Sequence, residues 1–287
     1  MNSSALAVID VGSNAIKYAL ALRSDMAVVK FERFETFHKG LDNNYNISEP
    51  YLDEIIKIIL YMKSQIQSFC ELHQWTYDII CVGTQVFRSA QNKQDFLQKI
   101  YHKCGIKLSI LSNEVEANFE KLGVQNDPAI LPFEHSSILL VDFGGGSTEF
   151  SWLFSTRPPL CIAVGKQDFM KQLSLEMFYD KYKLLYDALY ASLPKIFVLA
   201  GSTACCYAQC LQKMKSVNSI QNINLYYDEN YIHYVSQNER ATADIGAALV
   251  RFLQSFHPEQ MRFTTYGLRH GLIYAWANNL PEWMLIE

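Results

Sequence analysis

The sequence predicts an α/β protein in which one arrangement of strands and helices occurs twice. At two places, Asp10 and Asp142, an apolar strand ends in an aspartate that is followed by glycine and small polar residues. In each half, further strand patterns and then helical patterns follow this turn, so that both halves predict the order β-β-β-α-β-α. Because helices alternate with strands after the first hairpins, we expect a mixed sheet with a mostly parallel core in each half.

The first half begins with three strands joined by tight turns. A long amphipathic helix is predicted over 49–73, because its apolar residues recur at helical spacing and Ser48 is a suitable N-cap. The predicted strands are 5–10, 16–23, 27–35, 78–83 and 107–111, with helices that end near residue 103 and open at 112–117. The segment 126–134 contains Pro128 and Pro132 and is predicted to be the linker between the halves.

The second half repeats this order. Strands are predicted at 137–142, 148–154, 160–164, 196–200 and 262–266, and helices at about 166–190, from Gly201-Ser202-Thr203-Ala204 onward, at 228–237, at 240–254 and from Leu268 to before Pro281. No element is predicted for the polar region 211–227. The order of both halves is that of a ribonuclease-H-like unit. We therefore predict two such domains, residues 1–125 and 126–287, with the last helix, about 271–280, able to pack on the first.

Composition and charge restrict the class of protein. The content of 49% hydrophobic and 19% charged residues is typical of a globular protein, and the net charge of −4 provides no general attraction for a nucleic acid polymer. No apolar run approaches the roughly 18 residues of a membrane span, and no signal-peptide pattern opens the chain. The seven cysteines form no C-x-x-C pair. They favour a reducing compartment, and we expect a cytoplasmic protein without a membrane partner.

The two aspartate–glycine turns are candidate phosphate sites. Glycines allow a ligand to approach the backbone, and consecutive N–H groups in such a turn can bind an anion. A carboxylate repels phosphate, so Asp142 would act through a metal ion or a water molecule, or would orient a nucleophile. A glycine-rich hairpin with an Asx-type turn is the structural alternative. The repetition of the motif favours two domains that clamp a phosphate between them.

Motifs along most of the chain resemble the exopolyphosphatase / guanosine pentaphosphate phosphohydrolase (Ppx/GppA) family in its short, two-domain form. They are Asp10-Val11-Gly12-Ser13-Asn14, Thr84 with Arg88, Ala90 and Asn92, Glu116-Ala117, Asp142 to Thr148, Gly201 to Ala204, Arg240-Ala241 with Asp244-Ile245, and Gly267-Leu268-Arg269 with Gly271. Ala15, Asn113 and Asn118 depart from the family pattern. The resemblance implies the actin/sugar-kinase superfold, with two ribonuclease-H-like domains and a cleft between them.

The resemblance also implies roles for individual residues. Glu116 is the expected catalytic base, and Asp142 is its expected catalytic partner at a water molecule or Mg²⁺. The expected phosphate-binding residues are Gly12, Ser13, Asn14, Arg88, Gly144, Gly145, Gly146 and Ser147. The expected ligands of Mg²⁺, or of another divalent cation, are Asp10, Asp142 and Glu116. From the residues alone, Asn113 and Glu116 also fit a capping box, and Arg88 fits a surface charge. Lys17, Lys166, Arg240 and Arg269 fit a basic groove or solvated faces equally well.

The expected function is hydrolysis of the terminal phosphoanhydride bonds of inorganic polyphosphate, with release of orthophosphate. The alternatives are guanosine pentaphosphate 5'-phosphohydrolysis and a non-catalytic sensor of polyphosphate or of the guanosine alarmone. A kinase of the same superfold would need an adenosine pocket, for which the sequence has no separate signature. A Rossmann oxidoreductase and a P-loop NTPase are disfavoured, because neither glycine motif is present. The sequence leaves a homodimer open.

Overall fold

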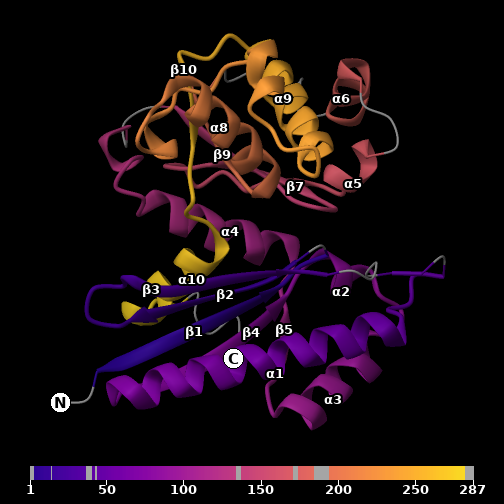
Figure 1. Ribbon diagram of the computed structural model, residues 1–287, viewed down its shortest axis with the longest axis vertical. Helices are drawn as coiled ribbons and strands as arrows, with labels where there is room; N and C mark the ends of the chain where they lie inside the picture. The colour runs from indigo at the N-terminus through magenta and orange to yellow at the C-terminus, as the bar shows by residue number, and fades with distance from the viewer. Residues whose placement is uncertain are drawn as a thin grey trace. The chain divides into compact units, whose positions relative to one another are not determined.

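A computed structural model describes residues 3–13, 15–36, 41–42, 44–133, 137–170, 174–183 and 194–281. The chain forms two compact units. The first consists of Met1–Phe119 together with Arg269–Glu287, and the second of Glu120–Leu268. Each unit contains one five-stranded sheet with helices beside it, as labelled in Figure 1.

The first unit has the strand order β3-β2-β1-β4-β5. β1 pairs antiparallel with β2 and parallel with β4, so the two hairpins lie at one edge and the parallel core at the other. α1 and α3 lie on one side of this sheet and α10 lies on the other (Figure 1). The elements are β1 (Ser4–Val11), β2 (Ala15–Leu22), β3 (Val28–Glu35), α1 (Glu49–His73), β4 (Thr76–Gly83), α2 (Gln85–Ser89), α3 (Lys93–Cys104), β5 (Leu108–Ile110), α4 (Asn113–Gln125) and α10 (Leu268–Ala277).

The second unit repeats this topology. Its strand order β10-β9-β6-β7-β8 becomes that of the first unit when it is followed from β8, with β6 in the place of β1. β6 pairs antiparallel with β7 and parallel with β9. The elements are a 3-10 turn (Leu131–Phe133), β6 (Ile138–Phe143), β7 (Thr148–Trp152), β8 (Leu160–Ile162), α5 (Lys166–Phe169), α6 (Leu175–Lys181), β9 (Ile196–Ala200), α8 (Ser202–Lys215), two 3-10 turns (Ile220–Asn222 and Glu229–His233), α9 (Arg240–Gln254) and β10 (Gln260–Phe263).

The apolar run at the start of β6 is explained by burial on both faces of the sheet. Leu139 and Val141 pack into the core that α8 and α9 cover, whereas Ile138 and Leu140 pack with Val124 of α4 on the opposite face. A strand that is covered on both sides is apolar at every position instead of at alternate ones. This is why an uninterrupted apolar segment leads directly to Asp142.

The prediction of two ribonuclease-H-like units is confirmed, and so are most element positions. The helix predicted over 49–73 has these bounds, and the Ser48 hydroxyl accepts a hydrogen bond from the Tyr51 amide. The predicted helix at 228–237 is instead a 3-10 turn, Glu229–His233. The helical stretch predicted over about 166–190 contains two short helices, α5 and α6, and 171–173 and 184–193 lie outside the described residues.

The described part of the predicted linker, residues 126–133, lies within the second compact unit and not between the two units, so its interpretation as a linker is wrong. Asp127 is buried, and its carboxylate accepts a hydrogen bond of 2.6 Å from Thr264. The compact units differ from the predicted domain limits, because 120–125 groups with the second unit and Arg269–Glu287 with the first. The prolines indicated a break in regular structure, but they carried no information about this buried contact.

Among the residues that the structure describes, no helix is both long and apolar enough to cross a membrane.

Candidate functional site

The first aspartate–glycine turn connects β1 and β2. The amide of Gly12 donates a 3.1 Å hydrogen bond to the carbonyl of Ala15, and this bond closes the turn. The Tyr51 hydroxyl of α1 donates to the carbonyl of Gly12 at 3.0 Å. Within the described residues, the amide of Ser13 has no acceptor. Asn14 was also expected to bind phosphate, and it lies outside the described residues.

The second turn, between β6 and β7, is closed by a corresponding hydrogen bond. The amide of Gly144 donates to the carbonyl of Ser147 at 3.0 Å, as Gly12 does to Ala15. The amides of Gly145, Gly146 and Ser147 have no acceptor in the part of the chain that the structure describes. Three successive amides without acceptors can bind an anion, and they are here called the amide nest. The sequence predicted phosphate binding at these residues, and that role stays a prediction.

Backbone hydrogen bonds join the start of α5 to the turn that carries the amide nest. The amides of Lys166 and Gln167 donate to the carbonyls of Gly144 and Gly145 at 3.0 and 2.9 Å. Gly165 has extended dihedral angles, φ −145° and ψ −165°, which any residue can adopt. However, a Cβ atom on Gly165 would lie 2.7 Å from the backbone nitrogens of Gly146 and Ser147. Packing against the nest therefore requires glycine at position 165.

Asp142 lies at the end of β6, directly before the amide nest. A Cβ atom on Gly201 would lie 2.8 Å from the Asp142 Oδ1 atom and 2.7 Å from the carbonyl oxygen of Phe143. Gly201 also has φ +91°, which disfavours other residues. The close approach of the β9–α8 connection thus fixes the backbone beside the Asp142 carboxylate. That carboxylate has no hydrogen-bond donor or cation among the described residues.

A buried hydroxyl pair supports the strand after the nest. The Thr148 hydroxyl donates to the carbonyl of Val164 at 2.6 Å and lies 2.8 Å from the Tyr182 hydroxyl. Burial raises the pKa of Tyr182 above its ordinary value, and the Thr148 contact lowers it by a smaller amount. Tyr182 therefore remains a neutral hydroxyl, and this part of the unit is held by uncharged hydrogen bonds.

Asp10 has cationic partners that the sequence did not assign to it. Its Oδ2 atom accepts a hydrogen bond of 2.9 Å from Arg269 and lies 3.8 Å from the Lys17 ammonium group. The Arg269 guanidinium also lies over the ring of Phe31, 5.1 Å from its centroid. Lys17 faces Asp10 across the first hairpin, and that pairing could have been predicted from the register. Arg269 follows Asp10 by 259 residues, and no local pattern links the two.

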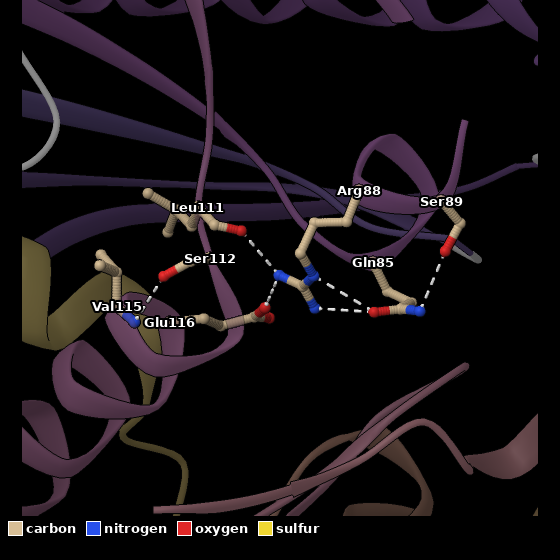
Figure 2. A network of polar contacts seen from close by, with 7 residues as sticks. All are labelled: Gln85, Arg88, Ser89, Leu111, Ser112, Val115 and Glu116. Atoms are coloured by element: carbon tan, nitrogen blue, oxygen red, sulfur yellow. Dashed lines mark hydrogen bonds and ion pairs between the residues drawn. The ribbon is translucent and has the colours of Figure 1, made fainter. Parts of the chain in front are cut away.

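Glu116 and Arg88 form an ion pair, which Figure 2 shows. The Arg88 Nη1 atom lies 2.5 Å from Glu116 Oε2 and also donates to the carbonyl of Leu111 at 2.9 Å. The Nε and Nη2 atoms of Arg88 both donate to the Gln85 side-chain oxygen, at 3.2 and 3.0 Å. Within the described residues, these bonds leave one N–H of Nη2 for a ligand. The structure thus brings together two residues that were expected to act on the same phosphate.

The first turn of α4 positions Glu116, but its cap differs from the expected one. The Ser112 hydroxyl accepts from the amide of Val115 at 3.2 Å, and the Ser112 carbonyl accepts from the amide of Glu116 at 2.9 Å. The side-chain oxygen of Asn113 is buried and has no hydrogen-bond donor. The interpretation of Asn113 as the cap is therefore wrong, because the helix starts at Asn113 itself, one residue earlier than that interpretation requires. Capping by Ser112 leaves the Glu116 carboxylate available for Arg88.

Two other predicted cations have local partners in the second unit. Arg240 donates to Asp244 at 2.8 Å, one helical turn further along α9. Asp244 also accepts a hydrogen bond from the Tyr231 hydroxyl. Lys166 lies 3.4 Å from the Thr242 hydroxyl. These contacts give both side chains a structural role.

The carboxylates fit a divalent cation to different degrees. Within the described ranges, no group of three or more His, Cys, Asp or Glu side chains could hold a metal ion. Asp10 and Glu116 already accept hydrogen bonds from arginines. Asp142 has no such partner and lies beside the amide nest. Since Mg²⁺ is commonly held by one or two carboxylates together with substrate phosphates, Asp142 fits a cation that arrives with a phosphate ligand.

The chain is similar in sequence to proteins with phosphatase, exopolyphosphatase or pyrophosphatase names, over between 52% and 97% of its length. It is 24% identical to a putative exopolyphosphatase of Haemophilus influenzae, over 97% of this chain and 93% of that protein. It is 28% identical to a bifunctional 3-dehydroquinate synthase/phosphatase of Fusobacterium nucleatum, over 52% of this chain, and it spans only 23% of that protein's length. It is 29% identical to a guanosine-5'-triphosphate,3'-diphosphate pyrophosphatase of Vibrio vulnificus, over 52% of this chain and 29% of that protein.

Solved structures share the fold. An exopolyphosphatase from Cytophaga hutchinsonii superimposes with a TM-score of 0.78 over 97% of this chain and 99% of that one, at 18% identity. The profile of the Ppx/GppA phosphatase family matches residues 25–176, which is more than half of the chain. The protein, with its two aspartate–glycine turns and its Arg88–Glu116 pair, belongs to the Ppx/GppA phosphatase family.

Proposed function

We propose that the protein hydrolyses the terminal phosphoanhydride bonds of inorganic polyphosphate and releases orthophosphate. The observation that carries this proposal is the amide nest at Gly145–Ser147, whose three N–H groups have no acceptor within the described residues. Membership of a phosphatase family and the relatives named as exopolyphosphatases support it. Amides without acceptors can bind the equatorial oxygens of a phosphoryl group, on which negative charge is spread in the transition state.

The proposed roles follow from the contacts of each side chain. Glu116 accepts a proton from the attacking water, and Arg88 orients its carboxylate. The remaining N–H of Arg88 Nη2 donates to a phosphate oxygen. In the first turn, Gly12, Ser13 and Asn14 bind phosphate, and in the second turn Gly144, Gly145, Gly146 and Ser147 do so. Binding of one substrate by both turns stays a prediction.

We propose a requirement for Mg²⁺ or another divalent cation, with Asp142 as its protein ligand. Such an ion neutralises charge on phosphate oxygens when it is bound. Without the ion, the carboxylate of Asp142 beside the nest would repel a phosphate chain. Asp10 and Glu116 were also expected to bind the metal. Their arginine partners would have to move before they could do so, so Asp142 is the ligand that this proposal requires.

A second substrate is supported by one observation. The relative from Vibrio vulnificus is named for guanosine-5'-triphosphate,3'-diphosphate, and it is 29% identical to this chain. Guanosine pentaphosphate carries a terminal phosphoanhydride bond like that of polyphosphate, so the same residues would act on both. A sensor that binds these compounds without hydrolysis is the non-enzymatic alternative. Within this proposal the protein works in the cytoplasm without a nucleic acid polymer or a membrane, and a homodimer is compatible with it.

The test is a phosphate-release assay on the purified protein with Mg²⁺. Inorganic polyphosphate and guanosine pentaphosphate are supplied in parallel, and binding of each is measured by calorimetry. Release of orthophosphate from polyphosphate with the higher kcat/KM is the expected result. Release of orthophosphate from guanosine pentaphosphate but not from polyphosphate would contradict the first substrate and support the second. Binding of either compound without any release would establish the sensor and contradict the enzyme.

A further inference from the structure

We propose that Gln85 is a positioning residue that holds the Glu116 carboxylate in place through Arg88. This inference rests on the proposed function, in which Glu116 is the catalytic base. No sequence motif singled out Gln85, because it occupies one of the variable positions between Thr84 and Arg88 in the matched segment. The evidence for its role is the polar network drawn in Figure 2.

The Gln85 carboxamide determines where the Arg88 guanidinium points. Its oxygen accepts from both Nε and Nη2 of Arg88, at 3.2 and 3.0 Å. Its nitrogen donates to the Ser89 hydroxyl at 3.1 Å. Because a guanidinium can only donate hydrogen bonds, the carboxamide must face Arg88 with its oxygen. A guanidinium held along one edge by a single oxygen keeps both its plane and its direction.

The opposite side of the guanidinium faces Glu116. Nη1 contacts Glu116 Oε2 at 2.5 Å and the carbonyl of Leu111 at 2.9 Å. The ion-paired side chains are only 15% exposed for Arg88 and 11% for Glu116, so solvent screens their attraction weakly. A change at Gln85 therefore alters the position of the Glu116 carboxylate through the rigid, planar guanidinium of Arg88.

Two elements of the first unit place Gln85, Arg88 and Glu116 together. Gln85 and Arg88 are three residues apart on this short helix, so their side chains lie on the same face. β5 ends beside β4, and the amide of Leu111 donates to the carbonyl of Gly83 at 3.0 Å. This contact brings the start of α4 within reach of the guanidinium. Gln85 of α2 thus acts on Glu116 of α4 through Arg88, and it has no proposed contact with the substrate.

The experiment compares Gln85→Met with wild type. Methionine has a similar length but neither accepts nor donates strongly, so Arg88 loses two of its hydrogen bonds. We expect kcat for phosphate release from polyphosphate to fall about 10- to 100-fold, because a displaced base slows the chemical step. KM should rise by a smaller factor, because Arg88 also donates to a phosphate oxygen in the proposed function. Gln85→Glu, whose carboxylate can still accept from Arg88, should restore most of kcat. Gln67→Met, which removes an exposed glutamine bonded to Glu71, is the matched control and should change neither constant.

A second readout does not depend on turnover. The Arg88 Nε–H resonance, assigned by its absence in Arg88→Lys, should lose protection from hydrogen exchange in Gln85→Met and keep it in Gln67→Met. If the wild type is active and Gln85→Met keeps both the wild-type kcat and the protection of Arg88, this inference is wrong. The proposed function would then still stand. A higher KM with an unchanged kcat would also overturn it, because Gln85 would then affect substrate binding and not the position of the base. A wild-type protein that releases no phosphate would contradict the proposed function and this inference with it.

Discussion

The carboxylate of Asp10 at the end of β1 is held by Arg269 at the start of α10, with 2.9 Å between Oδ2 and Nη1. Both side chains are largely buried, 9% and 14% exposed, and Lys17 lies 3.8 Å from the same oxygen. This ion pair connects α10 to β1. It gives Asp10 a structural role that is independent of any metal ion.

Replacement of Arg269 by methionine should destabilise the first unit. Among the described residues, the variant leaves the buried carboxylate with Lys17 as its cationic neighbour, so we expect the free energy of unfolding to fall by about 3 kcal/mol. Urea denaturation followed by fluorescence of Trp75 and Trp276 measures this change. The control is Lys195→Met, which breaks an exposed pair with Glu259 and should cost less than about 1 kcal/mol. Asp10→Asn combined with Arg269→Met should recover most of the loss, and failure to recover would show that lost packing on Phe31 is the larger effect.

Replacement of Gly165 by alanine should damage the amide nest. The added Cβ atom would lie 2.7 Å from two nest nitrogens, and backbone atoms cannot yield as a flexible side chain can. We expect polyphosphate binding, measured by calorimetry, to weaken by about tenfold for each N–H that no longer reaches the anion. Gly267→Ala is the matched control, since no atom lies within 4 Å of its added Cβ. Equal affinity in both variants would mean that the nest does not bind the substrate.

Replacement of Glu116 by glutamine should separate catalysis from binding. Glutamine keeps the size of the side chain but cannot accept a proton from water. Loss of a general base lowers kcat by about 10²- to 10⁴-fold, while circular dichroism should stay unchanged. The measurement is the initial rate of phosphate release at saturating polyphosphate. A variant with the wild-type kcat would show that another group activates the water.

The expected metal requirement can be tested at Asp142. We expect no phosphate release in excess chelator, full recovery on addition of Mg²⁺, and no recovery in Asp142→Ala. The reason is that a phosphate ligand beside this carboxylate needs a cation between the two negative groups. Calorimetric titration of Mg²⁺ into the protein with a non-hydrolysable polyphosphate analogue provides a readout besides activity. Turnover that persists in chelator would remove Mg²⁺ from the mechanism.

Protonation of His270 should lower stability in mild acid. Burial, with a smaller contribution from the Arg269 charge, lowers its pKa from 6.5 to about 4. The unfolded chain therefore binds a proton below about pH 6.5 that the folded chain does not, so this contribution to stability is complete above that pH and is lost as the pH falls toward 4. Between about pH 7.5 and about pH 5 we expect a loss of about 2 kcal/mol. His270→Leu should remove this part of the pH dependence, and an unchanged slope of unfolding free energy against pH would contradict the assignment.

The sequence alone predicted the features that repeat locally. Strand and helix periods, the Ser48 cap and the two aspartate–glycine turns are properties of neighbouring residues, and the structure has the Ser48 cap and both turns where they were predicted. The Gly144–Ser147 bond and its counterpart between Gly12 and Ala15 show that the same short motif closes the same turn in both units. Motifs in the right order also predicted the family, because they record local chemistry at each turn.

Only the tertiary structure decided which groups meet. Arg269 reaches Asp10, and Thr264 reaches Asp127, across sequence separations for which no pattern in one chain predicts a partner. Gly165 and Gly201 are required by backbone packing against the second turn, which their own neighbours in sequence do not indicate. The role of Gln85 likewise depends on β5 delivering Glu116 to the far side of Arg88. Local propensity fixes what each segment becomes, whereas the pairing of charges and the close approach of backbones arise when the sheets bring distant segments together.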